Sequence, residues 1–207
     1  MKKLLTIGAV ICMSIAASAQ TSESSHQART DARIGKMKVT QFMEINAKGN
    51  QMVNAITPDS KPLSTADQQL FMQVALGGMR QLMISQAVLG KATNEQVRLL
   101  AQSEVEEQTN VSNKLKQIAA AKGTAMPQQP DAETQTLVNS IKGMSADEVN
   151  LVYLREGGIR GHELLRTTMN TVKGNASDDA LEALAKATLP VIKTHLKVSK
   201  KVQGDLD

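Results

Sequence analysis

Cysteine is almost absent from this sequence of 207 residues, and tryptophan is absent altogether. The one cysteine, Cys12, lies in an N-terminal segment that we expect to be removed, for the reasons given below. The mature chain would then have no thiol, which excludes disulfide bonds, zinc–thiolate sites and cysteine nucleophiles. Any polar chemistry must therefore come from carboxylates, amides, hydroxyls and the three histidines.

Aromatic side chains are also scarce, since Phe42, Phe71 and Tyr153 are the complete set. Proteins that bind bases by stacking need aromatic platforms, so the composition disfavours that kind of binding. The formal charge of +4 falls to +2 without Lys2 and Lys3 (22 Lys and Arg against 20 Asp and Glu), which gives no reason to expect a nucleic-acid partner. The core must be built mainly from aliphatic side chains and methionine, and with few prolines this composition favours helices.

Residues 1–19 have the layout of a secretory signal peptide, with two lysines, an apolar stretch over residues 4–15 and small residues at 17–19. The apolar stretch is shorter than the ~20 residues that span a bilayer, and no later segment approaches that length. A lipid anchor on Cys12 is disfavoured because the bulky Ile11 precedes it. We therefore expect a cleaved signal, a periplasmic or envelope-associated location and no transmembrane segment in the mature chain.

The mature chain is predicted to consist of a leader region and one helical domain. Residues 20–63 are interpreted as a flexible leader followed by an accessory helix over residues 32–56, and Pro58 and Pro62 separate this helix from the domain. Residues 64–203 are interpreted as a four-helix bundle domain.

Capping residues and glycines divide this domain into four long helices. The predicted helices begin at Ser64 or Thr65, after Asn94, at Ser145 and at Ser177, and they end near residues 89, 122, 174 and 202. The first and last pairs are joined by short loops and should form antiparallel hairpins, whereas a long connection over residues 123–144 joins the two pairs. Two hairpins joined by one long crossover predict an all-α, ferritin-like four-helix bundle.

Each predicted helix carries a stripe of residues at alternating steps of three and four, which is the spacing that packs a bundle. Each stripe is apolar at its ends and polar near its middle. An unpaired buried polar group costs about 1–3 kcal/mol, so we expect these side chains to contact one another or to hold a ligand. The polar positions are Gln81, Glu104, Gln108, Arg155, His162, Thr188 and His195.

One interpretation of these residues is a metal site. His162, His195 and Glu104 would bind a single divalent ion, and Gln81 and Gln108 would orient these ligands. Ferritin-like bundles use inward-pointing carboxylates and histidines in this way.

The other interpretation is a hydrogen-bonded polar layer that fixes the register of the bundle and holds no cofactor. Di-iron bundles supply about four carboxylates with Glu-x-x-His spacing on two helices. Here Ile159 and Ile192 stand three residues before His162 and His195. The residue types therefore favour the polar layer over a redox di-metal centre, and the single-ion site stays open as the alternative.

Several short motifs resemble a bacterial exported family, the domain of unknown function 4142. They are Gly77-Gly78-Met79, the Ala-x-x-x-Gly-x-x-x-Pro pattern over Ala119–Pro127, Gly161-His162-Glu163, and Leu189-Pro190 followed by His195. The resemblance covers about residues 65–203. It implies a ferritin-like bundle in the periplasm or on the envelope, of a kind often labelled as a predicted outer-membrane protein, without an established reaction.

The chain departs from this family in three places, one of which is the family's Phe-Asp-x-x-Tyr motif, approximated here only by Val149 to Tyr153. The other two concern candidate site residues. The family commonly has a glutamate where this chain has Gln81, and an Asp-His pair where it has Glu107-Gln108. The two histidines His162 and His195 carry over. The latter two departures therefore fall on candidate metal ligands.

No Ser-His-Asp order, phosphate loop or His-Glu-x-x-His motif is present, so a non-enzymatic role is expected. The leading hypothesis is an exported helical-bundle protein, a structural or stress-linked envelope component with a polar core layer. The second is a metal-binding protein for sequestration or sensing. The third is an adaptor for a protein partner in the envelope, which would present an apolar surface formed by Met37, Phe42, Met43 and Met52. The simpler interpretation, that this segment only covers the bundle, is favoured over the adaptor.

Overall fold

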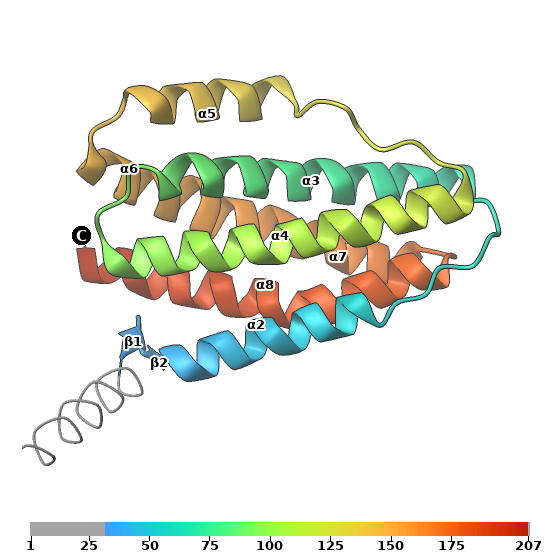
Figure 1. Ribbon diagram of the computed structural model, residues 1–207, viewed down its shortest axis with the longest axis horizontal. Coiled ribbons are helices and arrows are strands. Elements are labelled where there is room, and N and C mark those ends of the chain that lie inside the picture. Colours follow the sequence, from blue (N-terminus) through green and yellow to red (C-terminus); the bar gives the residue numbers. More distant parts are fainter. Residues whose placement is uncertain (1–31, 207) are drawn as a thin grey trace, which may run out of the picture.

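The computed structural model describes residues 32–206, and this part of the chain is mostly helical, as predicted (Figure 1). The predicted signal peptide and most of the predicted leader lie outside the described residues. In chain order the elements are β1 (Arg33–Ile34), β2 (Met37–Lys38), α2 (Val39–Asn54), α3 (Thr65–Leu89), α4 (Glu95–Lys122), α5 (Ala132–Gly143), α6 (Ala146–Val152), the π-helix η1 (Tyr153–Gly161), α7 (His162–Asn175) and α8 (Asp179–Leu206).

The long helices begin where side chains can cap them. Ser64 and Asn94 accept hydrogen bonds from first-turn backbone amides of α3 and α4, and Ser145 forms a complete capping box with Glu148. These three starts confirm the prediction. The start of α8 differs by one residue, because Asp178 rather than Ser177 caps it by accepting from two backbone amides of its first turn.

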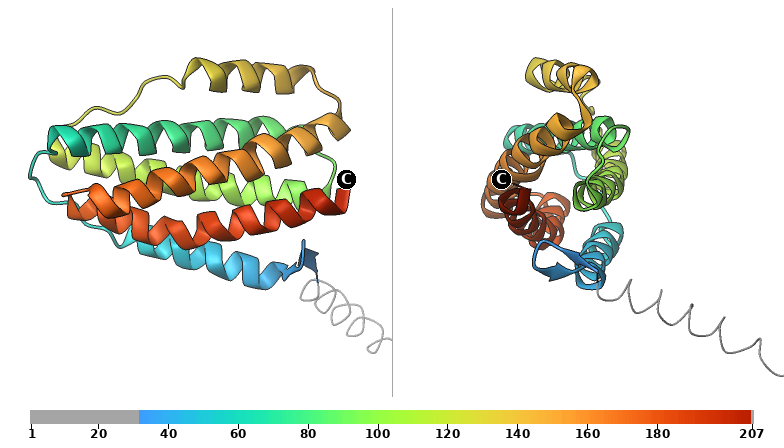
Figure 2. Two further views of the ribbon diagram at one scale, coloured as in Figure 1. Left: turned by 180° about the vertical axis from the view of Figure 1, so that it is seen from behind. Right: turned by 90° about the vertical axis from the view of Figure 1, so that its left-hand side faces the viewer.

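The helices lie side by side in two hairpins with additional helices on opposite flanks (Figure 2). Helix α3 packs on α4, and α7 packs on α8. Helix α5, within the crossover, packs on the outer side of α3, whereas α2 lies across α8 and α4 on the other flank (Figures 1 and 2). Among residues 32–206, no helix combines the length and the apolar character that a membrane span requires.

The predicted alternation of apolar ends and a polar middle is confirmed. One buried apolar cluster lies at the end of the bundle that contains Phe71 and Leu181, and a second lies at the end that contains Ile84 and Tyr153. Between them in the sequence of each helix lies a layer of buried polar side chains: Gln81, Glu104, Gln108, His162 and His195.

The accessory helix is shorter than predicted, because residues 33–38 form a hairpin instead of its first turns. The chain reverses at Gly35, which has a φ of 55°, a backbone conformation that glycine adopts without strain. Helix α2 then covers the bundle. Phe42 is fully buried, as the interpretation that this segment covers the bundle requires, so it does not contribute to the exposed apolar surface of the adaptor hypothesis, although Met43 and Met52 are 38% and 42% exposed.

The third predicted helix is also not uniform, because its middle is the nine-residue π-helix η1. Extra residues in each π turn rotate the side chains that precede it relative to those that follow. Leu151 and Arg155, predicted to lie on the buried stripe with His162, are exposed for this reason.

Candidate metal centre

The centre of the polar layer is the side chain of Glu104, which projects from α4 and is fully buried. One oxygen of its carboxylate, Oε2, lies 2.8 Å from Nε2 of His162 and 2.9 Å from Nδ1 of His195. The three residues come from α4, α7 and α8, and the rings of the two histidines lie 5.2 Å apart, centroid to centroid. One nitrogen of each imidazole therefore faces the same carboxylate oxygen.

The other nitrogen of each ring is held by an oxygen that can only accept a hydrogen bond. Nδ1 of His162 lies 2.9 Å and 3.0 Å from the carbonyl oxygens of Gly157 and Gly158. Nε2 of His195 lies 2.7 Å from Oδ1 of Asn46 on α2. In neutral imidazoles these outer nitrogens therefore carry the proton, and the inner nitrogens present lone pairs. This is how metal-binding histidines are usually oriented.

The π-helix supplies the two carbonyl groups that hold His162, and its glycines make this segment fit. A Cβ atom on Gly158 would lie 2.7 Å from Oγ of Ser199, and one on Gly157 would lie 2.9 Å from the Tyr153 ring. A Cβ atom on Gly161 would overlap the amide of Gln81. Because glycine has no Cβ atom that would clash at these positions, the segment can approach α3 and α8 closely enough to place His162.

The two glutamines of the predicted site both lie beside it. Gln108 donates a hydrogen bond of 3.0 Å from Nε2 to the second oxygen of Glu104, and Gln81 donates one of 3.0 Å to the carbonyl of Gly157. Gln108 also lines a crevice of about 100 Å³ between α3 and α4. The structure therefore brings the three candidate ligands and both glutamines together. In contrast, Thr188 donates to the carbonyl of Leu184 in its own helix.

Phe42 and Asn46 on α2 close the site on one side. The Phe42 ring stacks on the His195 ring with centroids 5.0 Å apart. Asn46 accepts from His195, as described above, and its own Nδ2 has no hydrogen-bond partner. No pattern in the sequence indicates that Asn46 belongs to the site, because the position of α2 depends on its tertiary packing.

The charges of the three central groups depend on one another. Burial alone would raise the pKa of Glu104, but the neighbouring His162 and His195 outweigh burial and lower this pKa. Burial also disfavours a charged His162, yet the Glu104 carboxylate raises the pKa of this imidazole above its ordinary value. At His195 burial prevails and lowers the pKa despite the hydrogen bond to Glu104. Without a metal, the cluster therefore favours one imidazolium, at His162, beside one carboxylate.

A second buried carboxyl group, that of Glu107, was not among the predicted site residues. Its side chain follows Glu104 on the same face of α4, is 4% exposed, and has no hydrogen-bond partner at either oxygen. Its Oε2 lies 3.8 Å from Nδ1 of His195. Burial and the nearby Glu104 carboxylate raise the pKa of Glu107 well above its ordinary value.

Two imidazoles and a carboxylate with ligand atoms within 4.8 Å of one another form a group that could hold a metal ion. Nitrogen and oxygen donors of this kind suit first-row divalent ions. The fold and the site together define an all-α protein with a buried histidine–glutamate cluster in its core.

The chain belongs to the family described as domain of unknown function (DUF4142), whose model matches residues 53–202. No curated protein and no solved structure matches it. The matched region contains Glu104, His162 and His195, whereas Phe42 and Asn46 lie before it.

Proposed function

We propose that this protein binds a single divalent metal ion at Glu104, His162 and His195, and that it does so for sequestration or sensing rather than catalysis. One observation carries the proposal: the inner nitrogens of both imidazoles face one oxygen of a buried carboxylate. When both outer nitrogens carry their protons, three lone pairs converge on one point, and they repel one another unless a cation lies between them.

A proton bound at the cluster can replace the metal ion only in part. An imidazolium at His162 satisfies its contact with Glu104, but His195 resists a second proton because its pKa is lowered by burial. A divalent ion would satisfy both nitrogens and the carboxylate at once. The outer hydrogen bonds from the backbone carbonyls and Asn46 would hold the rings in the required orientation.

The competing interpretation is a hydrogen-bonded polar layer that holds no ion. It requires neutral His195 to carry its proton on Nδ1 and the Asn46 amide to be turned over, so that Nδ2 donates to the ring. This arrangement gives a partner to Asn46 Nδ2, which otherwise has none. It still leaves both oxygens of the neighbouring Glu107 without a partner.

The wider setting of the proposal is an exported protein with a ferritin-like bundle. The two antiparallel pairs, α3 with α4 and α7 with α8, and the crossover that carries α5 support the ferritin-like arrangement. The signal-like residues 1–19 support export to the periplasm or envelope. A redox di-metal centre is not proposed, since Gln81 and Gln108 offer amides where carboxylates or imidazoles would be needed.

The test is the metal content of the protein purified from the periplasm and measured by mass spectrometry. We expect close to one equivalent of a divalent metal in the wild-type protein, and loss of that metal in a His162→Ala, His195→Ala double variant. A His162→Gln, His195→Gln variant keeps polar side chains in the layer and should lose the metal while remaining folded.

The matched control is Glu163→Gln, since Glu163 adjoins His162 but points outward to Lys200, 2.7 Å away. This variant should retain the metal. Absence of metal from the wild-type protein, both as purified and after incubation with Zn²⁺, Mn²⁺ or Fe²⁺, would contradict the proposed function and favour the polar layer.

A further inference from the structure

The carboxyl group of Glu107 is buried beside the candidate metal centre and contacts no hydrogen-bond donor or acceptor. It is 4% exposed, and neither of its oxygens has a partner among the described residues. Buried polar side chains are almost always paired, so an unpaired one next to a cluster of metal-binding groups indicates a missing ligand. Glu107 lies three positions after Glu104, so both carboxyl groups lie on one face of α4.

Of the distances between candidate ligand atoms, two are shorter and one is longer than those expected around a bound tetrahedral ion. A tetrahedral ion with bonds of about 2.0–2.2 Å holds its ligand atoms about 3.3–3.6 Å apart. Oε2 of Glu104 lies 2.8 Å and 2.9 Å from the two inner nitrogens, and Oε2 of Glu107 lies 3.8 Å from Nδ1 of His195. Shifts of about half an ångström would bring these three distances to the tetrahedral value. Glu107 is not in the group whose ligand atoms already lie within 4.8 Å of one another, so the closed shell also requires its carboxylate to move toward Glu104 and His162.

Other polar side chains near the centre contact the outer nitrogens of the imidazoles or present a hydrogen-bond donor to Glu104. Oδ1 of Asn46 contacts the outer nitrogen of His195, and Nε2 of Gln81 lies 3.4 Å from the outer nitrogen of His162. Gln108 presents its amide nitrogen, a donor, to Glu104. Gln81 also has an unpaired oxygen, Oε1, but its amide contacts His162 at the outer nitrogen, whereas the unpaired Oε2 of Glu107 lies 3.8 Å from an inner nitrogen.

We propose that Glu107 is the fourth protein ligand of the ion and that, with the two imidazoles and Glu104, it closes a tetrahedral shell. This inference rests on the proposed metal-binding function. Two carboxylates balance the charge of a divalent ion when both imidazoles are neutral, which removes the cost of burying a net charge.

The closed shell defines the class of ion and what the site does with it. Two nitrogen and two oxygen donors suit Zn²⁺, Co²⁺ or Fe²⁺, whereas Mg²⁺ and Ca²⁺ prefer shells of oxygen and Cu⁺ prefers sulfur. Catalytic zinc sites keep one position for water, but four protein ligands leave none. The site therefore holds an ion and does not present it to a substrate.

The experiment is a titration of the metal-free mature protein with Co²⁺, followed by visible absorption. Tetrahedral Co²⁺ absorbs more intensely than Co²⁺ with water-expanded coordination. We expect Glu107→Gln to raise the apparent dissociation constant at least about tenfold and to weaken the absorption band, because water replaces the lost carboxylate. Glu107→Asp, with a carboxylate one methylene shorter, should give an intermediate affinity.

The matched control is Glu106→Gln, the same chemical change at an exposed position of the same helix. It should bind Co²⁺ as the wild-type protein does. If Glu107→Gln binds Co²⁺ with wild-type affinity and spectrum, the assignment of Glu107 as fourth ligand is wrong, but the proposed metal-binding function is not contradicted. A wild-type protein that binds no Co²⁺ would overturn both, so the two failures are distinguishable.

Discussion

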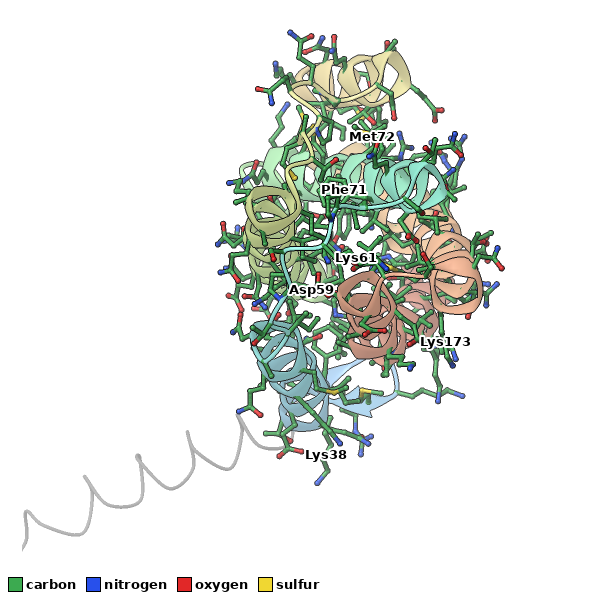
Figure 3. All side chains as sticks on the ribbon, turned by 90° about the vertical axis from the view of Figure 1, so that its right-hand side faces the viewer. Lys38, Asp59, Lys61, Phe71, Met72 and Lys173 are labelled. Carbon is green, nitrogen blue, oxygen red and sulfur yellow. The ribbon has the colours of Figure 1, made fainter. Side chains whose placement is uncertain are left out.

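Two buried ionic clusters in this protein satisfy their charges to very different degrees. One is the central layer around Glu104. The other lies at the end of the bundle where the connection between α2 and α3 crosses the start of α8, the end that faces the viewer in Figure 3. We refer to Asp59, Asp67, Lys122, Ser177 and Asp178 as the end cluster.

The end cluster pairs its charges fully. Nζ of Lys122 lies 2.5 Å from Asp178 and 2.6 Å from Asp59, and it donates to the carbonyl of Lys61. Asp67 accepts from both the backbone amide and the hydroxyl of Ser177. No side-chain atom of this cluster is among the buried polar atoms that lack a partner within residues 32–206.

The central layer is different, since both oxygens of Glu107, one amide nitrogen of Asn46 and one amide oxygen of Gln81 have no partner. A fully satisfied buried network stabilises a fold, whereas a partly satisfied one reduces stability. The comparison indicates that the end cluster fastens a loop and a helix start together, whereas the central layer leaves buried polar atoms unsatisfied, as the proposed binding of a metal ion would require.

The largest expected effect comes from breaking the central layer. Glu104→Gln removes the one carboxylate that faces both imidazoles and should destabilise the metal-free protein by about 3 kcal/mol, as expected for a broken buried ion pair. Urea denaturation in the presence of a chelator measures this change. Glu106→Gln, exposed on the same helix, should stay within about 0.5 kcal/mol of wild type. Equal denaturation midpoints for the two variants would contradict the charge assigned to Glu104.

A smaller effect is expected at the end cluster. Lys122→Met keeps the buried stem of the side chain but leaves Asp178 without its cation, and should cost about 2 kcal/mol. The cost is below that of the central layer because Asp59 is largely exposed and can be hydrated. Lys116→Met, an exposed position on α4, is the control. If the two lysine variants denature at the same urea concentration, the end cluster contributes nothing measurable to stability.

The smallest effect concerns acid. Burial would raise the pKa of Asp67, but hydrogen bonds from Ser177 and Ser64 outweigh it and hold this pKa below the ordinary 3.8. Since the folded state binds the proton less readily than the unfolded state, this stabilisation is complete above 3.8 and is lost as the pH falls through the lower, folded value. Asp67→Asn should therefore cost about 1 kcal/mol at neutral pH and progressively less below about pH 3. A difference between the two proteins that does not shrink with acid would be inconsistent with this assignment.

Much of the helical framework could be predicted because it depends on local sequence. The starts at Ser64, Asn94 and Ser145 are determined by side chains that cap their own helices. The polar middle of each stripe was also predictable, since a seam of alternating steps identifies the buried face of a regular helix.

The rest of the site could not be predicted, for three different reasons. Glu107 is displaced by one residue from the stripe that contains Gln108, so a regular seam does not include it, and only the family resemblance drew attention to the pair Glu107-Gln108. Asn46 enters the site through the packing of α2, which no local pattern encodes. Leu151 and Arg155 were misplaced because the spacing of an α-helix does not apply across the π-helix.

The π-helix also determines which kinds of mutation the protein can accept before His162. Removing one residue from Tyr153–Gly161 would let the segment relax toward an ordinary α-helix, since the extra residue is what widens its turns. The helix would then keep about the same total rotation, because an α-helix with one residue fewer replaces the wider π turns. The segment itself would change, because the carbonyl groups of Gly157 and Gly158, which hold Nδ1 of His162, would enter the regular backbone hydrogen bonds of an α-helix. A single-codon deletion in this segment would therefore weaken the orientation of His162 with every ligand of the cluster still present.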